Sequence, residues 1–290
     1  MNAELLVLRG LLHVFTTVML ESLIGGGNWS TRSVRQDAWR FAALGQISFS
    51  GKCAKLNWML AGGDEDKPAL QLLDRLVFDA GIRKAEYVLA DINPLHPGFE
   101  GFRQAGFCPW GWGQIWQMDS GKLQESSEVA TWSTPAASDM IELLGLQRRL
   151  LPPAVQAVSR LADEHLPDFI LRQNGRIVAY ADSTVFGQKV MIRLTHEPCI
   201  PDLTQLVAGL FQRHFPLTPD RFILQRGDQV SLQEAMAGCA SMVMPRFERM
   251  VKYLTVPLKV PVGAGAVVNN RHHADPVTPM LKTSGRQDNL

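Results

Sequence analysis

Charged side chains at the ends of apolar strands are the first candidates for chemistry in this sequence. Asp91 lies in the apolar run 87–92, and His196 and Glu197 follow the apolar run 189–195. A carboxylate or an imidazole in such a place can act as a general base when its pKa lies near the working pH. The same residue types are also common as solvated or paired structural groups, so a catalytic role is a hypothesis to be tested.

Three tryptophans near the middle of the chain offer a second kind of chemistry. Trp110, Trp112 and Trp116 are interleaved with Gly111 and Gly113. Such rings can stack on a flat ligand, although they are more often core or hairpin residues. No phosphate-binding P-loop, serine nucleophile elbow or zinc motif appears in the sequence.

The cysteines and the charge balance exclude several classes of protein. No two of the four cysteines stand at metal-ligand spacing, so we predict no metal site. Isolated cysteines are typical of a reducing compartment, and we expect a cytoplasmic protein. The formal net charge is +1 and the basic residues are scattered, which gives no electrostatic reason to expect binding to nucleic acid or to an anionic membrane. The four cysteines are Cys53, Cys108, Cys199 and Cys239.

An apolar segment near the N-terminus raises the question of a signal peptide or a membrane span. Residues 5–24 are interrupted by Arg9, His13 and Glu21, and Glu4 stands where a signal peptide needs basic residues. We therefore predict an amphipathic helix that packs on the protein's own core. Attachment of this helix to a membrane surface is an alternative.

The elements that must position these side chains alternate between strands and helices. The clearest is a helix over 69–80, whose apolar residues recur on one face and which ends at Gly81. The other elements predicted in the first half are a short helix over 31–41, strands over 43–50, 54–60 and 87–92, a short helix over 96–105 and a strand over 112–118.

The second half repeats a similar order after a polar stretch, 119–128, which we interpret as a linker. Asn174-Gly175 is a hairpin signal between two of its strands, and residues 261–290, with His272-His273, are expected to form a loose tail. The predicted elements are helices over 136–150 and from Pro152, strands over 168–174, 176–186 and 189–195, a helix over 202–213, a strand over 221–225, a helix over 228–237 and a strand over 250–254.

The order of elements and several short segments resemble the GNAT acetyltransferase family. The segments AKLNWML, ALQLLDRLVFDAG, YVLADIN and RQAGF between Ala54 and Met118 carry the resemblance. The second half carries it more faintly, in RIVAYADSTVFGQ, VMIRLTHEP and DLTQLVAGLFQ. The resemblance implies an α/β fold with a mixed sheet and two tandem GNAT-like halves, over residues 1–118 and 129–260. Two unrelated α/β pieces are the alternative.

The resemblance also implies acetyl-CoA as a cofactor and names residues that would hold it. The backbone from Met59 through Leu60, Ala61 and Gly62 to Gly63 would contact it. Two glycines allow close approach of backbone N–H groups to phosphate oxygens. The three carboxylates of Asp64, Glu65 and Asp66 oppose phosphate binding, however, and favour a simple helix N-terminus at this place.

Other positions of the family pattern are only partly preserved. Asn93 matches a family Asn that can contact the cofactor, although Asn-Pro is also a common turn opener. The family's proton-donating Tyr is replaced by Phe102 in the first half and by Glu234 in the second. In the second half, the loop that would cradle the phosphates contains Pro198 and Pro201, which have no N–H to donate.

Two functions from different classes follow from these residues. The first is an N-acetyltransferase that uses acetyl-CoA and a small-molecule or protein amine, with Asp91, Glu197 and Glu234 as candidate catalytic residues. The second is a catalytically degenerate tandem GNAT protein that binds a ligand or a partner. The eroded loops and the missing Tyr favour the second function, and the catalytic habit of the family favours the first.

Overall fold

The computed structural model describes most of the first 254 residues of the chain. The described residues are 3–9, 28–35, 41–61, 67–119, 132–151, 156, 165–198 and 200–254. Several predictions lie outside them: the helix beyond residue 9, Gly62 and Gly63, residues 120–128 of the linker, the helix from Pro152 and the tail.

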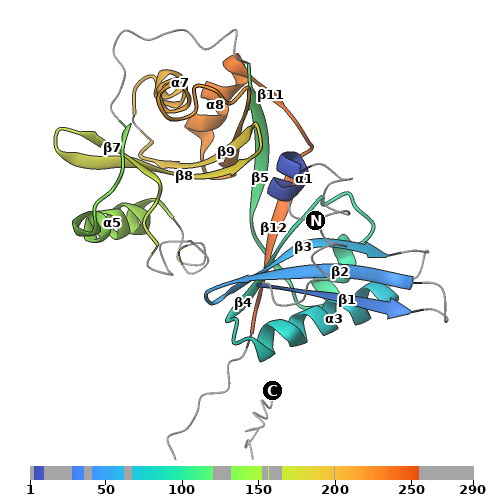
Figure 1. Ribbon diagram of the computed structural model, residues 1–290. Helices are drawn as coiled ribbons and strands as arrows, with labels where there is room; N and C mark the ends of the chain where they lie inside the picture. The colour runs from blue at the N-terminus through green and yellow to red at the C-terminus, as the bar shows by residue number, and fades with distance from the viewer. Residues whose placement is uncertain are drawn as a thin grey trace, which may run out of the picture. The chain divides into compact units, whose positions relative to one another are not determined.

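The first half consists of strands that alternate with helices, as the periodicity predicts (Figure 1). The 16-residue helix α3 buries Leu72, Leu73 and Leu76 against the strands, and its predicted position is confirmed. The elements are α1 (Ala3–Arg9), β1 (Trp29–Arg35), β2 (Phe41–Ser50), β3 (Cys53–Ala61), α3 (Lys67–Ile82), β4 (Tyr87–Ile92), α4 (Phe99–Gln104) and β5 (Cys108–Met118).

The second half repeats the order strand, helix, strand, helix. Asn174 and Gly175 both have positive φ, at 52° and 78°, so they form the predicted hairpin turn. The elements are β6 (Trp132–Ser133), a 3-10 turn η1 (Ala137–Asp139), α5 (Met140–Leu150), β7 (Phe169–Gln173), β8 (Arg176–Phe186), β9 (Lys189–His196), α7 (Leu203–His214), β10 (Asp220–Arg226), α8 (Val230–Cys239), β11 (Ala240–Met242) and β12 (Phe247–Tyr253).

The described strands form one mixed sheet in which the two halves exchange strands. The order is β1-β2-β3-β4-β12-β5-β10-β9-β8-β7-β6, and β11 pairs with β5 off this path. β12, the last strand of the chain, lies between β4 and β5 of the first half and is antiparallel to both. The end of β5 in turn lies between β10 and β11 of the second half. Each half is therefore completed by a strand from the other.

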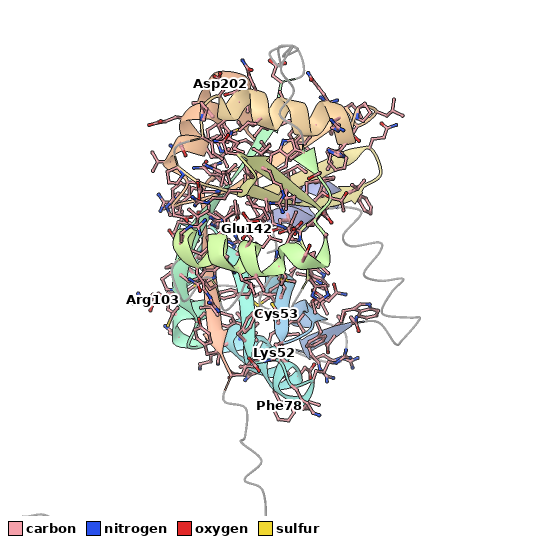
Figure 2. All side chains as sticks on the ribbon, turned by 90° about the vertical axis from the view of Figure 1, so that its left-hand side faces the viewer. Lys52, Cys53, Phe78, Arg103, Glu142 and Asp202 are labelled. Carbon is pink, nitrogen blue, oxygen red and sulfur yellow. The ribbon has the colours of Figure 1, made fainter. Side chains whose placement is uncertain are left out.

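Two apolar cores lie under the helices of the two halves. In the first half, α3 packs against β1, β2 and β3 (Figure 1), while Phe78 on its outer side is 68% exposed (Figure 2). In the second half, α7 and α8 cover one face of β8, β9 and β10. α5 packs through Leu143 and Leu146 against Ile170, Ile177 and Tyr180 of β7 and β8 in a separate cluster.

One predicted element is wrong. The segment Trp29–Arg35, which we predicted as the start of a helix over 31–41, is strand β1 and pairs antiparallel with β2 from Trp29↔Ser48 to Arg35↔Phe41. Thr31 and Val34 are β-branched and fit a pleated strand better than a helix. The hydrogen bonds that stabilise this strand come from β2, and the sequence of residues 29–35 alone does not reveal them.

The N-terminal segment begins as a helix, in agreement with its apolar pattern. α1 buries Ala3, Val7 and Leu8 in a cluster with residues of β5, β9, β10 and β12. Within the described part of the chain, no helix is both long enough and apolar enough to cross a bilayer.

Candidate functional site

The strands β3 and β4 of the first half run parallel and then diverge. Their pairing covers only Cys53↔Tyr87, Ala54↔Val88 and Lys55↔Leu89. β3 nevertheless continues to Ala61, paired with β2 on its other side, and β4 continues to Ile92, paired with β12. Beyond Lys55 the two strands are not paired with each other. Such a divergence between parallel strands is a place where an extended ligand can bind.

A β-bulge lies on β3 just after the strands part. Gln46 pairs with Trp58 and Ile47 pairs with Leu56, so Asn57 is the extra residue. Bulges turn a strand and redirect its backbone and side chains, and they are common beside active sites. The Asn57 amide nitrogen donates to Gln46 Oε1 at 3.0 Å, and the Ser48 hydroxyl donates to Asn57 Oδ1 at 2.9 Å. These bonds hold the bulge in a fixed conformation.

The described part of the predicted cofactor site lies on both sides of the divergence. Met59, Leu60 and Ala61 form the end of β3, where the Leu60 side chain is 44% exposed. Asn93 follows the end of β4, and its Oδ1 accepts a hydrogen bond of 2.9 Å from the backbone N–H of Leu95. The Asn93 side chain thus stabilises a turn, which is the simpler of its two predicted roles.

The three predicted catalytic carboxylates stand on different elements. Asp91 is buried on β4, and its Oδ1 lies 3.5 Å from Nε of Arg249 on β12. Glu197 pairs with both Arg149 and Arg176. Glu234 is exposed on α8. Only Asp91 belongs to the diverging strands of the first half.

Glu4, which was not among the predicted site residues, is a buried carboxylate in a cluster of charged side chains. Glu4 of α1 is buried, and its carboxylate lies 2.6 Å from Arg193 of β9 and 3.4 Å from Lys55 of β3. Burial by itself would raise the pKa of the Glu4 carboxyl, but the charges of Arg193, Lys55 and Arg249 outweigh it and hold this pKa far below its ordinary value.

Glu4 therefore acts as a fixed negative charge rather than as a proton carrier. It links α1 to strands of both halves, and Lys189 adds a hydrogen bond of 3.1 Å to the carbonyl oxygen of Val7. Arg193 in turn donates to the Thr184 hydroxyl at 3.2 Å. In the sequence, Glu4 stands out only as an acidic residue next to an apolar segment. Nothing near it in the sequence indicates that Arg193 and Lys55 are its partners.

The second half contains a matching pair of diverging strands, β9 and β10. They pair from Lys189↔Asp220 to Arg193↔Leu224, and β9 then continues to His196. The pairing of β9 with β8 is regular, so this divergence has no bulge. α7 begins after Asp202, whose φ of 48° is strained for a residue other than glycine (Figure 2).

His196 is buried at the end of β9. Its Nδ1 lies 2.8 Å from the Glu197 carbonyl oxygen and must carry the proton of this hydrogen bond. Its Nε2 is buried and has no hydrogen-bond partner among the described residues. Burial lowers the pKa of the His196 imidazole below its ordinary value. The neutral ring is therefore the form that the fold favours.

The tryptophans that could have stacked on a ligand have partners within the protein. The Trp110 ring lies 4.8 Å from the Arg249 guanidinium, and the Trp112 ring lies 4.1 Å from that of Arg246. Trp116 Nε1 donates to a buried glutamine of β10. These contacts within the protein support the alternative interpretation, in which the three tryptophans have a structural role.

Comparison with known proteins finds similar structures but no match in sequence. No protein-family model matches the chain, and no curated protein is significantly similar to it in sequence. A functionally unknown conserved protein from Staphylococcus epidermidis has a similar structure, with a TM-score of 0.52 and 9% identity over 78% of this chain and 95% of its own.

Two further structures bear acetyltransferase names. A GCN5-related N-acetyltransferase from Sphaerobacter thermophilus has a TM-score of 0.49 and 13% identity over 77% of this chain and 80% of its own. A tandem GNAT protein from the clavulanic acid biosynthesis pathway has a TM-score of 0.44 and 12% identity over 81% and 86%. The similarity to the Staphylococcus epidermidis protein shows a shared mixed α/β fold. The repeated element order and the two diverging parallel pairs are those that the resemblance to the GNAT family implies.

Proposed function

We propose that this protein transfers an acyl group from acetyl-CoA to an amine at the divergence of β3 and β4. The observation that carries the proposal is the early end of the β3–β4 pairing, followed directly by the bulge at Asn57. An extended ligand with amide groups can bond to the unpaired backbone between two such strands. The partly exposed end of β3 at Leu60 leaves this place accessible.

The residues that would hold acetyl-CoA are those at the end of β3, Met59 to Ala61, with Gly62, Gly63 and the N-terminus of α3. The N-terminus of a helix favours negative charge and can hold a pyrophosphate, but the carboxylates of Asp64, Glu65 and Asp66 before this helix weaken that attraction. Acetyl-CoA supplies an activated thioester to the reaction. The protein binds and orients it, and the reacting amine must arrive without its proton.

The site has few residues that could move a proton. Among the three predicted catalytic carboxylates, Asp91 is the one on the diverging strands, and we assign the role of base to it. Phe102, at the position of the family's Tyr, is buried and packs edge-on against Phe107 at 5.3 Å between ring centroids. Its ring has no proton to give to a leaving thiolate, so this proton would come from solvent.

These same features support a second function, the binding of acetyl-CoA or a related ligand without transfer. Asp91 contacts Arg249, and a carboxylate held by a guanidinium is less available to a substrate amine. We propose a small-molecule or protein amine as the acceptor for the enzymatic function. For both functions we propose a cytoplasmic location.

Thermal unfolding with and without ligands tests the proposed function. A ligand at 100 times its Kd stabilises a folded protein by about 2.7 kcal/mol, which raises Tm by several degrees in a protein of this size. We expect a shift with acetyl-CoA and with coenzyme A, and none with ATP. The absence of a shift at millimolar acetyl-CoA would exclude acetyl-CoA as the cofactor and would leave the second function, in which the protein binds another ligand or a partner.

Two matched tryptophan variants locate the binding event. Trp58 follows the bulge on β3 and Trp132 is buried in the second half. The change in fluorescence on adding acetyl-CoA should be lost in Trp58→Phe and kept in Trp132→Phe. Release of thiol with a panel of amines then separates transfer from binding, and Asp91→Asn should abolish transfer while keeping the thermal shift.

A further inference from the structure

A buried glutamine side chain bridges the two strands of the second half where they part. Gln229 lies just before α8 and is 5% exposed. Its Nε2 donates to the carbonyl oxygen of Leu194 on β9 at 2.6 Å. Its Oε1 accepts from the backbone N–H of Arg226 on β10 at 2.9 Å. The Gln229 side-chain amide thus bonds to one backbone acceptor on β9 and one backbone donor on β10. Both groups lie beyond the last pair of these strands, Arg193↔Leu224.

A second glutamine completes the bridge. Gln225 on β10 is fully buried, and its Nε2 donates to the backbone carbonyl oxygen of Gln229 at 3.1 Å. Its Oε1 accepts from Trp116 Nε1 at 2.7 Å. Both carboxamides have partners for the oxygen and for the nitrogen. Removing them would leave buried backbone groups without hydrogen-bond partners, which is unfavourable.

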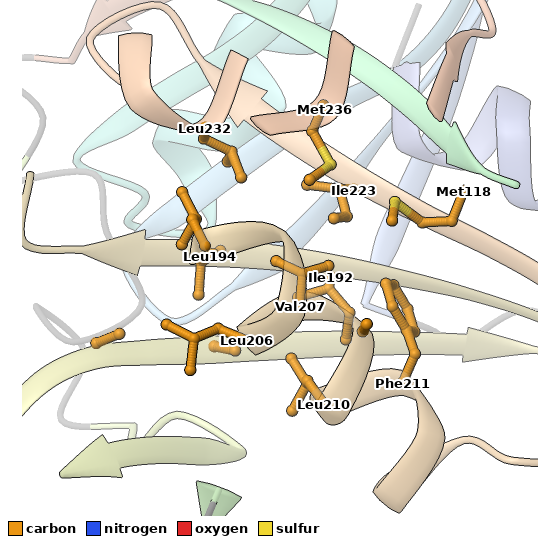
Figure 3. Packing of buried hydrophobic residues seen from close by; sticks show 14 of the residues in the cluster. Met118, Ile192, Leu194, Leu206, Val207, Leu210, Phe211, Ile223, Leu232 and Met236 are labelled. Atoms are coloured by element: carbon orange, nitrogen blue, oxygen red, sulfur yellow. The ribbon is translucent and has the colours of Figure 1, made fainter. Parts of the chain in front are cut away.

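The surroundings of the bridge are apolar and closely packed. Leu232 and Met236 of α8 approach Leu194 and Ile223 of the two strands in one buried cluster (Figure 3). Leu232 and Met236 are fully buried. A ligand that entered between these strands would have to displace both the amide bridge and this packing.

β3 in the first half and β9 in the second half occupy equivalent positions, but the ends of these strands differ in exposure. β3 ends in the partly exposed Leu60 and in the exposed Ala61. β9 ends in Leu194, Thr195 and His196, which are 1%, 4% and 6% exposed. The first divergence is therefore accessible at its end, and the second is closed.

We propose that Gln229, supported by Gln225, seals the second divergence, so that one chain binds one acyl-CoA, in its first half. The number of bound ligands rests on the proposed function, whereas the seal itself does not. Gln229 fills with its own amide the place between the strands where a ligand amide would otherwise bond. The second half then serves to complete the sheet of the first through β12.

Hydrogen exchange of the side-chain amides tests the seal without any ligand. The Gln229 resonance is assigned from its loss in Gln229→Ala. Gln233, exposed one turn later on α8, provides the matched control through Gln233→Ala. We expect the Gln229 amide to exchange slower than that of Gln233 by at least about tenfold. Equal exchange rates would overturn the seal.

Isothermal titration with acetyl-CoA tests the consequence for binding. We expect one site per chain in the wild type and in Gln233→Ala. Two sites in the wild type would overturn the inference. If the wild type binds no acetyl-CoA, the proposed function fails, and the hydrogen-exchange result alone then decides whether the second divergence is sealed.

Discussion

The buried carboxylate of Glu4 has been taken out of water, and it is stable there only because cations surround it. Removing one member of a buried charge group costs about 3–5 kcal/mol, since the remaining charges lose their partner. We expect Glu4→Gln to lower the free energy of unfolding by about 3 kcal/mol, measured by urea denaturation. Arg193 and Lys55 would then be left without their shared carboxylate.

The control for this variant is Glu100→Gln. Glu100 forms an exposed pair with Arg103 on α4, at 3.1 Å. Such surface pairs contribute about 0–1 kcal/mol. Similar losses in the two variants would contradict a central role for Glu4.

His196 predicts a dependence of stability on pH. Its folded pKa is lowered below the ordinary value of 6.5, so the unfolded chain binds a proton more readily than the folded one. The free energy of unfolding should therefore fall as the pH drops below 6.5. Above pH 6.5, His196 should not make it depend on pH. Denaturation between about pH 7 and about pH 5 should show a smaller decline in His196→Gln than in the wild type.

The residues of the site were only partly predictable from the sequence. The turn at Asn93 and the strand β3 were predictable because each follows a recognisable local pattern. The partners of Glu4 were not, because Arg193 is 189 residues away and no local rule connects them. The pairing of Asp91 with Arg249 depends in the same way on the insertion of β12 between β4 and β5.

Two glycines of β5 show how closely this strand packs on β12. A Cβ at Gly113 would lie 2.5 Å from Cζ of the buried Phe247, whereas a Cβ at Gly111 would meet no atom within 4 Å. We expect Gly113→Ala to lose about 1–3 kcal/mol through overpacking. Gly111→Ala should stay within about 0.5 kcal/mol of the wild type. Chemical denaturation of the two variants measures the difference, and equal stability would show that Phe247 can move aside.

Long periodic elements were predictable and short or edge elements were not. The helix α3 and the strand β4 lie where the apolar pattern places them, because α3 buries one face and β4 is an apolar run buried along nearly its whole length. β1 was mistaken for a helix, since its identity depends on pairing with β2. β6 and β11, with two and three residues, are too short to leave a pattern.

The exchange of β5 and β12 makes the two halves depend on one another. Separating them would remove a central strand from each, so we expect them to unfold in one cooperative transition. Cys53 on β3 and Cys239 at the end of α8 should become reactive to a thiol reagent at the same urea concentration. The exposed Cys108 should react without urea. Separate midpoints for Cys53 and Cys239 would show that each half is stable alone.

The insertion of β12 also delays completion of the sheet during synthesis on the ribosome. β4 and β5 are complete when Met118 has been made, but their shared partner ends at Tyr253, about 135 residues later. At about 5–20 residues per second, the two strand edges wait roughly 7–27 s for it. Unpaired edges attract other strands, so the nascent chain should need a chaperone during this interval. Ribosome-bound chains stalled near residue 200 should be cleaved by protease in β4 and β5, and released full-length chains should resist.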